Sequence, residues 1–336
     1  MSSDGTVAIG GSVNIPHELS STLIAAFGSS GIEGWQPLLG GRSDARLYSF
    51  QVGSRAFVLR HLNADRPDHQ AKVNREFLCT TLASKLGVAP AVQHVDTVNG
   101  VIISDRIPYL PISASPRAVD FAPRLAFSLK KLHSGPPFPV GQTLLESMST
   151  VQSRITDLGF PGIPKPLIDT IEIIASAIAP FAESAPCHHD LNPTNIIDTG
   201  DAIYFLDWEI ACMSDPFIDI GQLGVFVFPS PDMRRNFLTS YLGQDPTPIH
   251  LARELLGRII ALAFYVVAFI KLSVESGKLS KDMPSPLPLP ELFTLLGTRP
   301  QEASPALFAS CLYNEMLIGT RSMRFNESIE LIRSSS

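Results

Sequence analysis

The chain has 336 residues, of which 45% are apolar and 17% are charged, and its formal net charge is −6. This balance is typical of a globular protein long enough for two lobes, and it argues against a disordered chain. Nucleic-acid binding calls for a basic face, and no Lys/Arg cluster stands out in the sequence, so we expect no nucleic-acid partner.

The sequence also argues against secretion and membrane insertion. The first 15 residues lack the basic start and the long apolar core of a secretory signal. The most apolar run, residues 259–270, is shorter than the ~20 residues that span a bilayer, so we expect a buried helix and no membrane span. We therefore predict a soluble, cytoplasmic protein; the sequence does not indicate its oligomeric state. Four widely spaced cysteines are predicted to be buried thiols: Cys79, Cys187, Cys212 and Cys311.

Short strands dominate the first third of the chain. Residues 16–29 predict an amphipathic helix, and a Gly-containing turn follows at 38–44. Alternating apolar residues then predict strands at 46–52, 56–62, 92–95 and 101–104, with a helix at 70–86 between the two pairs. The order strand, strand, helix, strand, strand predicts a small antiparallel sheet with one main helix.

Helices dominate the chain after Pro108. They are predicted at about 116–134, 165–183, 231–242, 249–276 and 304–319, with one short hairpin near 196–207. Prolines between apolar runs are interpreted as loops, 283–290 among them, and 325–336 as a frayed tail. We expect an α+β fold with an N-terminal extension and helix over residues 1–30, a small lobe over 31–108, and a larger, mostly helical lobe over 109–336.

Polar side chains flank the predicted hairpin. A turn signal at residues 198–201 places Asn195 opposite Asp207, with Cα atoms ~5 Å apart in an antiparallel pair. Asp190 lies in the loop just before the hairpin. Carboxylates and an amide oxygen form an oxygen-only ligand set that suits Mg²⁺ bound together with substrate phosphates. The sequence therefore predicts that these three side chains converge on one magnesium site that binds substrate phosphates.

The motif H-x-D-x-x-x-x-N, from His188 to Asn195, is followed by Asp207-Trp208-Glu209. This pair of motifs resembles the aminoglycoside phosphotransferase and choline kinase family, whose fold is that of protein kinases. The resemblance extends over residues 35–225 and implies a two-lobed, protein-kinase-like fold.

The same resemblance implies roles for the motif residues. Asp190 would be the catalytic base or would orient the acceptor hydroxyl, and His188 would order the catalytic loop rather than transfer a proton. Asn195 and Asp207 would be the metal ligands. Asp219, in the family's D-P-x-x-D segment, would hydrogen-bond the backbone of the catalytic loop. Trp208 is interpreted mainly as a core residue.

A nucleotide site is implied in the small lobe. The segment Phe57-Val58-Leu59-Arg60 takes the place of the strand that carries the phosphate-contacting lysine. Because side chains alternate along a strand, Val58 and Arg60 share a face, where Val58 would support the adenine and Arg60 would reach the α- and β-phosphates. Glu76 is the expected ion-pair partner of Arg60. An arginine keeps the charge of the usual lysine but is forked and bulkier.

Two further segments are implied in nucleotide binding. Gly41 and Ser43 belong to the turn expected to cover the phosphates. Asp105 and Ile107 lie where the family has its hinge, and their backbone groups would meet the edge of the adenine.

The predicted activity is ATP- and Mg²⁺-dependent phosphorylation of a small-molecule hydroxyl. Residues 207–216 are more similar to bacterial choline-kinase-like proteins than to aminoglycoside enzymes, so an amino alcohol such as choline or ethanolamine is favoured. Its ammonium group would need an aromatic or acidic cage. The candidates for that cage are Phe226, Phe228, Phe264, Tyr265, Glu275 and Glu315.

Several alternatives stay open at this point. The chain is interpreted alternatively as an aminoglycoside or other small-metabolite O-phosphotransferase, or as a non-catalytic, nucleotide-binding pseudokinase. A protein kinase is disfavoured by the D-W-E segment and by the long helical insert at 116–183. A zinc site at His188, His189 and Asp190 is disfavoured because adjacent residues rarely point at one metal.

Overall fold

The computed structural model describes residues 6–7, 15–28, 31–38, 45–62, 67–108, 112, 120–142, 144–159, 162–181, 184–277 and 283–335. The chain forms two compact units. The first consists of Met1–Pro139 and Pro193–Cys212, and the second of Val140–Asn192 and Met213–Ser336. The predicted turn that contains Gly41 and Ser43 lies outside the described residues. The predicted boundaries at residues 30 and 108 stay a prediction.

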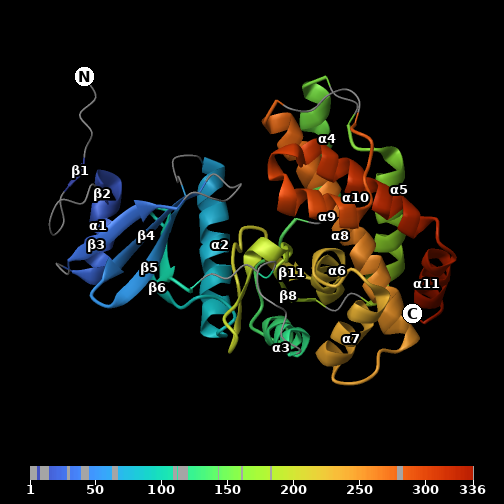
Figure 1. Ribbon diagram of the computed structural model, residues 1–336, viewed down its shortest axis with the longest axis horizontal. Helices are drawn as coiled ribbons and strands as arrows, with labels where there is room; N and C mark the ends of the chain where they lie inside the picture. Colours follow the sequence, from blue (N-terminus) through green and yellow to red (C-terminus); the bar gives the residue numbers. More distant parts are fainter. Residues whose placement is uncertain are drawn as a thin grey trace. The chain divides into compact units, whose positions relative to one another are not determined.

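The first unit is built on a five-stranded antiparallel sheet (Figure 1). In spatial order its strands are β3 (Ile32–Pro37), β4 (Arg46–Val52), β5 (Arg55–His61), β7 (Val101–Asp105) and β6 (Val92–Asp96). The other elements are β1 (Thr6–Val7), β2 (Ile15–Pro16), α1 (His17–Phe27), α2 (Pro67–Lys85), α3 (Phe121–His133), η2 (Pro193–Asn195), β9 (Ile196–Asp198) and β10 (Ile203–Phe205). The predicted order of strand, strand, helix, strand, strand is confirmed by β4, β5, α2, β6 and β7. β3 was not predicted.

Helices α1 and α2 cover opposite faces of this sheet (Figure 1). Phe57 and Leu59 of β5 are buried with Leu19 and Leu23 of α1. Val73 of α2 belongs to a separate cluster on the other face. Because side chains alternate along a strand, Val58 and Arg60 share the face opposite to Phe57 and Leu59, as the sequence predicted. Both residues are half-buried.

The second unit is mostly helical. Its helices are α4 (Leu144–Asp157), α5 (Lys165–Ile178), α6 (Pro216–Phe226), α7 (Pro231–Leu242), α8 (Pro248–Glu275), α9 (Leu289–Thr298), α10 (Pro305–Thr320) and α11 (Met323–Ser334), and the 3-10 helices η1 (Ala179–Phe181) and η3 (Pro300–Glu302) are also present. A small sheet pairs β8 (Ala185–Cys187) with β11 (Cys212–Ser214).

Prolines begin four of these α-helices. The predicted helices at 231–242, 249–276 and 304–319 start within one residue of three of these prolines, and the start at Pro216 was not predicted. In each case a side-chain oxygen of the preceding residue accepts a hydrogen bond from a backbone N–H of the first turn. The first helical position needs no N–H donor, and proline already has a helical φ, so this pairing favours a helix start. The pairs are Asp215-Pro216, Ser230-Pro231, Thr247-Pro248 and Ser304-Pro305.

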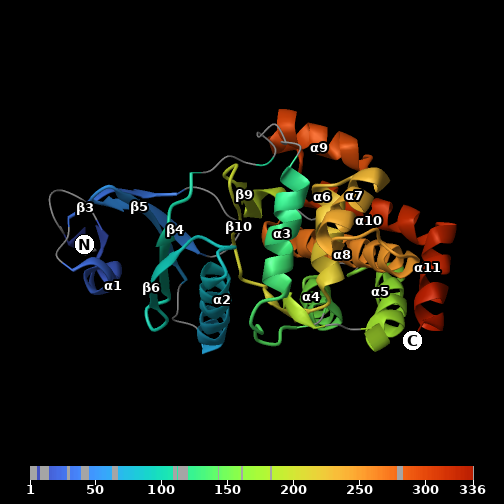
Figure 2. The same cartoon turned by 90° about the horizontal axis from the view of Figure 1, so that it is seen from below.

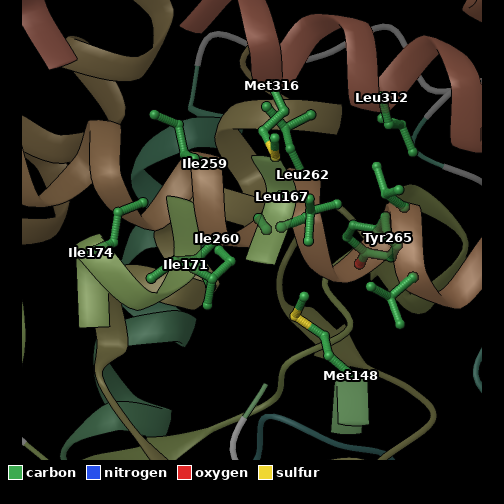
Figure 3. Packing of buried hydrophobic residues seen from close by; sticks show 14 of the residues in the cluster. Met148, Leu167, Ile171, Ile174, Ile259, Ile260, Leu262, Tyr265, Leu312 and Met316 are labelled. Atoms are coloured by element: carbon green, nitrogen blue, oxygen red, sulfur yellow. The ribbon is translucent and has the colours of Figure 1, made fainter. Parts of the chain in front are cut away.

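Helix α8 forms the centre of the second unit, with α4, α5, α6 and α10 around it (Figure 2). By length and composition α8 could cross a membrane, but 61% of its most apolar window is buried. Its apolar side chains belong to one large cluster with residues of the surrounding helices (Figure 3). The segment therefore packs as the buried helix that the sequence predicted.

The four cysteines are free and buried, as the sequence predicted.

Two glycines let α6 and α8 cross with their backbones in contact. A Cβ atom on Gly221 would lie 2.2 Å from the backbone of Gly257, and one on Gly257 would lie 2.0 Å from the carbonyl oxygen of Phe217. Any side chain at either position would force the helices apart. The close approach fixes α6 against α8, and both helices carry residues of the candidate site.

The predicted frayed tail is wrong, because most of it forms α11. Ser322 caps this helix by accepting a hydrogen bond from the N–H of Phe325. Phe325, Ile329 and Ile332 are buried in the large cluster of the second unit. Their spacing of four and three residues is helical, so this apolar stripe holds the C-terminal segment against the core.

Candidate active site

Arg60 bridges two carboxylates in the first unit. Its Nε lies 2.6 Å from Oε1 of Glu76, and its Nη2 lies 3.0 Å from Oδ1 of Asp207. The Arg60 and Glu76 side chains are largely buried, with 15% and 2% exposure. The predicted contact between Arg60 and Glu76 is therefore confirmed, and the planar, forked guanidinium binds both acids at once, which a lysine ammonium does less well.

The electrostatics of this cluster favour a charged arginine. Burial opposes the charge of Arg60, but the nearby carboxylates of Glu76, Asp207 and Glu209 outweigh it and raise the pKa of the guanidinium. Burial raises the pKa of Glu76, and the charge of Arg60 opposes this rise without reversing it. Arg60 is thus a fixed positive charge beside the carboxylate of Asp207.

Helix α2 also holds the segment that follows Asp207. Arg75 donates from Nη2 to the carbonyl oxygen of Glu209 at 2.8 Å, and Nζ of Lys72 lies 3.4 Å from the Glu209 carboxylate. Trp208 is 2% exposed and donates its indole N–H to the carbonyl of Phe205, which confirms its role in the core. Asp207 itself has a φ of +63°, a conformation that is uncommon outside glycine and is stabilised here by these surrounding contacts. The contacts of Lys72 and Arg75 were not predicted from the sequence.

Asn195 and Asp207 lie at the same end of the β9–β10 hairpin, but the predicted register is wrong by one residue. Ile203 pairs with Asp198, and the N–H of Leu206 donates to the carbonyl of Asn195 at 2.9 Å, so Asn195 faces Leu206 and not Asp207. The cause is the loop of residues 199–202, which the N–H of Thr199 closes by donating to Ala202. Asn195 is the last residue of a 3-10 turn, and both residues carry the hard oxygen atoms that Mg²⁺ prefers.

The predicted hinge residues lie at the end of β7. The backbone N–H of Asp105 donates to the carbonyl of Ala91, and its carboxylate pairs with Arg55 at 2.8 Å. Ile107 lies two residues beyond the strand and is half-buried. Contact of Asp105, Ile107 and Val58 with a nucleotide stays a prediction.

Buried Asp219 organises the catalytic loop in the second unit. Its two carboxylate oxygens accept hydrogen bonds from the backbone N–H groups of His188 and His189, each at 2.8 Å. His188 is fully buried, and its Nδ1 accepts the backbone N–H of Asp190 at 3.2 Å. The predicted bonds from Asp219 to the loop backbone are confirmed, and His188 orders the loop as expected.

Gln222 also binds this loop, although the sequence analysis did not assign it a role. Its Oε1 accepts the N–H of Leu191 at 2.9 Å, and its Nε2 donates to the carbonyl of His189. The Gln222 amide thus bonds the backbone on both sides of Asp190. A signal was available, because residues three apart on a helix share a face and Gln222 follows Asp219 by three positions.

The Asp190 carboxylate receives two hydrogen bonds on one oxygen. The hydroxyl of Tyr265 lies 2.8 Å from Oδ1, and Nδ2 of Asn192 lies 3.0 Å from the same atom. Asp190 and His188 belong to the second unit, whereas Arg60, Glu76, Asn195 and Asp207 belong to the first. The predicted convergence of Asp190 with Asn195 and Asp207 stays a prediction.

The residues considered for an ammonium cage have different surroundings. Phe228 stacks on Phe237 at 4.7 Å, and both are buried, so Phe228 is a core residue. The two carboxylates are paired with arginines, Glu275 with Arg154 at 3.2 Å and Glu315 with Arg258 at 3.3 Å. Three of the aromatic candidates adjoin one another, because Tyr265 contacts both Phe226 and Phe264.

Comparison with known proteins identifies relatives of this chain. Residues 34–252 match the profile of the phosphotransferase enzyme family, APH. The Protein LicA homolog of Mycoplasma capricolum is 33% identical over 79 residues, which are 24% of this chain and 33% of that protein. Protein LicA of Haemophilus influenzae is 42% identical over 38 residues, 11% of this chain and 14% of that protein. The aligned segments thus span a third or less of these relatives.

Solved structures resemble the fold over most of its length. A choline/ethanolamine kinase family protein from Mesorhizobium loti has a TM-score of 0.69 at 21% identity, covering 94% of this chain and 97% of that one. The choline kinase LicA from Streptococcus pneumoniae has a TM-score of 0.61 at 15% identity, covering 86% and 92%. These likenesses confirm the predicted α+β, protein-kinase-like fold.

Proposed function

The chain belongs to the phosphotransferase enzyme family, and on this premise we propose that it is an ATP- and Mg²⁺-dependent kinase of a small-molecule hydroxyl. One observation carries the proposal. Asp190, the motif aspartate, lies in a loop whose backbone is bonded to the buried carboxylate of Asp219. Phosphoryl transfer makes few covalent demands on a protein, so a carboxylate held in a fixed place is what the reaction needs.

In the proposed reaction Asp190 orients the acceptor hydroxyl and accepts its proton. The acceptor oxygen forms a bond to the γ-phosphorus of ATP as the bond from that phosphorus to the β–γ bridging oxygen breaks. ADP leaves with the electron pair of the broken bond. The product is a phosphate monoester of the acceptor.

Asn195 and Asp207 are the residues that would hold Mg²⁺, because their amide and carboxylate oxygens match its preference. When bound, the metal neutralises charge on the phosphate oxygens. Arg60 supplies a second positive charge beside Asp207, and we propose that it contacts the α- and β-phosphates. Glu76 anchors Arg60 at the back of this site.

We further propose an amino alcohol, with choline and ethanolamine first, as the acceptor class. The names of two structurally similar proteins support this order of testing, since one is a choline/ethanolamine kinase family protein and the other is a choline kinase. Half-buried Phe226 and Phe264, which both contact Tyr265, offer aromatic surface on the same unit as Asp190. Glu275 and Glu315 are paired with arginines, so the ammonium group would be bound mainly by aromatic rings.

The test is a panel of amino alcohols, sugars and aminoglycosides with ATP and Mg²⁺, read by acceptor-dependent release of ADP. Asp190→Asn should bind nucleotide normally and lose ~10²- to 10⁴-fold in turnover, the range for a lost positioned base. Asp207→Ala should lose Mg²⁺-dependent ATP affinity in calorimetry. Asp201→Asn, an exposed acid in the hairpin turn, is the matched control and should behave like the wild type.

Two outcomes would contradict the proposal. Near-wild-type turnover of Asp190→Asn on the true acceptor would show that Asp190 is not the catalytic base. A pseudokinase would bind nucleotide but show neither acceptor-dependent ADP release nor slow Mg²⁺-dependent hydrolysis of ATP.

A further inference from the structure

Tyr265 contacts the Asp190 carboxylate from the middle of α8. Its hydroxyl lies 2.8 Å from Oδ1 of Asp190, and the residue is 5% exposed. Two phenylalanine rings enclose the tyrosine ring nearly at right angles: Phe226 at 4.7 Å and 86°, and Phe264 at 5.1 Å and 78°. Figure 3 shows Tyr265 within the large buried cluster of the second unit. The hydroxyl oxygen is therefore held in one place by core packing.

The hydroxyl is a hydrogen-bond donor to Asp190. Burial, and then the negative charge of Asp190, raise the pKa of Tyr265 well above its ordinary value, so the phenol keeps its proton. Asn192 donates to the same Oδ1 at 3.0 Å. A carboxylate on its own rotates broadly about its last torsion angle, and two donors on one oxygen restrict that rotation.

We propose that Tyr265 is a positioning residue for phosphoryl transfer, whose hydroxyl holds the Asp190 carboxylate in the orientation that receives the acceptor hydroxyl. This inference rests on the proposed function, because it assigns Asp190 the task of orienting the acceptor. It extends the H-x-D-x-x-x-x-N motif by a residue that lies 75 positions further along the chain. Tyr265 acts through Asp190 and not by contact with the reacting atoms.

A different use of Tyr265 makes a different kinetic prediction. A ring that serves as one wall of an ammonium cage would contribute mainly to acceptor binding, and its hydroxyl would be dispensable. A hydroxyl that positions the carboxylate contributes to the transition state and leaves ground-state binding nearly unchanged. The split between kcat and KM therefore separates the two roles.

The first experiment compares Tyr265→Phe with the wild type on the best acceptor of the panel. The variant keeps the ring and loses only the hydroxyl. We expect kcat to fall ~10- to 100-fold, the scale of a misplaced catalytic group, while KM for ATP and for the acceptor stays within about threefold. Tyr313→Phe, which removes a hydroxyl from a partly buried tyrosine of α10, is the control and should leave both constants unchanged. Far-UV circular dichroism verifies that each variant is folded.

The second experiment is a double-mutant cycle with Asp190→Asn, read in single-turnover reactions with labelled ATP. If Tyr265 acts through the Asp190 carboxylate, Tyr265→Phe should change the residual rate of Asp190→Asn by less than about threefold. If the rate losses of Tyr265→Phe and Asp190→Asn multiply fully in the double variant, the inference is overturned. It is also overturned if Tyr265→Phe alone leaves kcat unchanged, or if that variant changes only the KM for the acceptor, which rises.

The two proposals fail in distinguishable ways. If Asp190→Asn retains turnover, the proposed function itself fails. If Asp190→Asn collapses turnover and Tyr265→Phe does not, the function stands and only the role of Tyr265 is refuted.

Discussion

The substitution Asp219→Asn removes one of the two carboxylate oxygens that bind the backbone of the catalytic loop. The buried carboxylate accepts two backbone N–H groups, from His188 and His189, at 2.8 Å each. Asparagine has nearly the same shape but only one acceptor oxygen, and its amide nitrogen would face the second N–H as another donor. The substitution therefore leaves one buried backbone donor unsatisfied without creating a cavity.

The loss of stability follows from these contacts. One hydrogen bond to a charged group contributes ~1.5–3 kcal/mol, and an unsatisfied buried N–H costs a further ~1–3 kcal/mol. Removing the charge relieves part of the cost of burying it, so we expect a net loss of about 2–5 kcal/mol. Turnover should fall as well, by ~10²-fold, because Asp190 directly follows the two residues whose backbone N–H groups Asp219 binds, and one of these bonds is lost.

Guanidinium unfolding followed by far-UV circular dichroism is the appropriate assay. The second unit is mostly helical, whereas both tryptophans, Trp35 and Trp208, lie in the first unit, so fluorescence would report on the wrong part. Asp232→Asn, an exposed acid in the first turn of α7, is the control and should change stability by less than ~0.5 kcal/mol. A similarly small change in Asp219→Asn would refute the assigned role of the carboxylate.

Two further predictions concern the first unit. Arg60→Lys should lower the free energy of unfolding of the first unit, followed by tryptophan fluorescence, by ~1–3 kcal/mol, because an ammonium does not reproduce both carboxylate contacts. The control is Arg55→Lys, at an exposed ion pair on the same strand, which should lower it by less than ~0.5 kcal/mol. Equal losses in the two variants would contradict the bridge that Arg60 forms between Glu76 and Asp207. Arg124 donates two hydrogen bonds to Asp198 and thereby lowers the pKa of the Asp198 carboxyl in the folded protein. The stability that this ion pair contributes is therefore complete above the pKa of Asp198 in the unfolded chain, ~3.9, and it disappears as the pH falls through the lower pKa of the folded state. Asp198→Asn should therefore flatten the acid side of the stability profile below about pH 4, and an unchanged profile would contradict the pairing.

The sequence predicted the parts of the site that depend on local pattern. Alternation along residues 57–60 placed Val58 and Arg60 on one face of β5, and the family resemblance implied the contacts of Glu76 and Asp219. A turn signal between two apolar runs identified the hairpin, and an apolar run too short to span a bilayer indicated that α8 is buried. In each of these cases a short stretch of chain or a known motif contained the necessary information.

Other features depended on details that pattern alone does not fix. The hairpin register differed by one residue because a loop of residues 199–202 set the pairing, and a turn signal does not specify loop length. The apolar stripe of α11 was present in the sequence, but its position at the end of the chain led to the prediction of a frayed tail instead of a helix. The contact between Tyr265 and Asp190 joins residues 75 positions apart, and only the packing of α8 brings them together.

Phosphorus NMR of the complete reaction tests the central claim most directly. With ATP, Mg²⁺ and an amino alcohol, the wild-type chain should convert the γ-phosphate signal of ATP into a phosphate monoester signal of the acceptor, together with the signals of ADP. Asp190→Asn should form that monoester at least ~10²-fold more slowly while binding nucleotide as the wild type does. Monoester formation at an equal rate in the variant, or consumption of ATP by the wild type that yields only inorganic phosphate with every acceptor in the panel, would contradict the account.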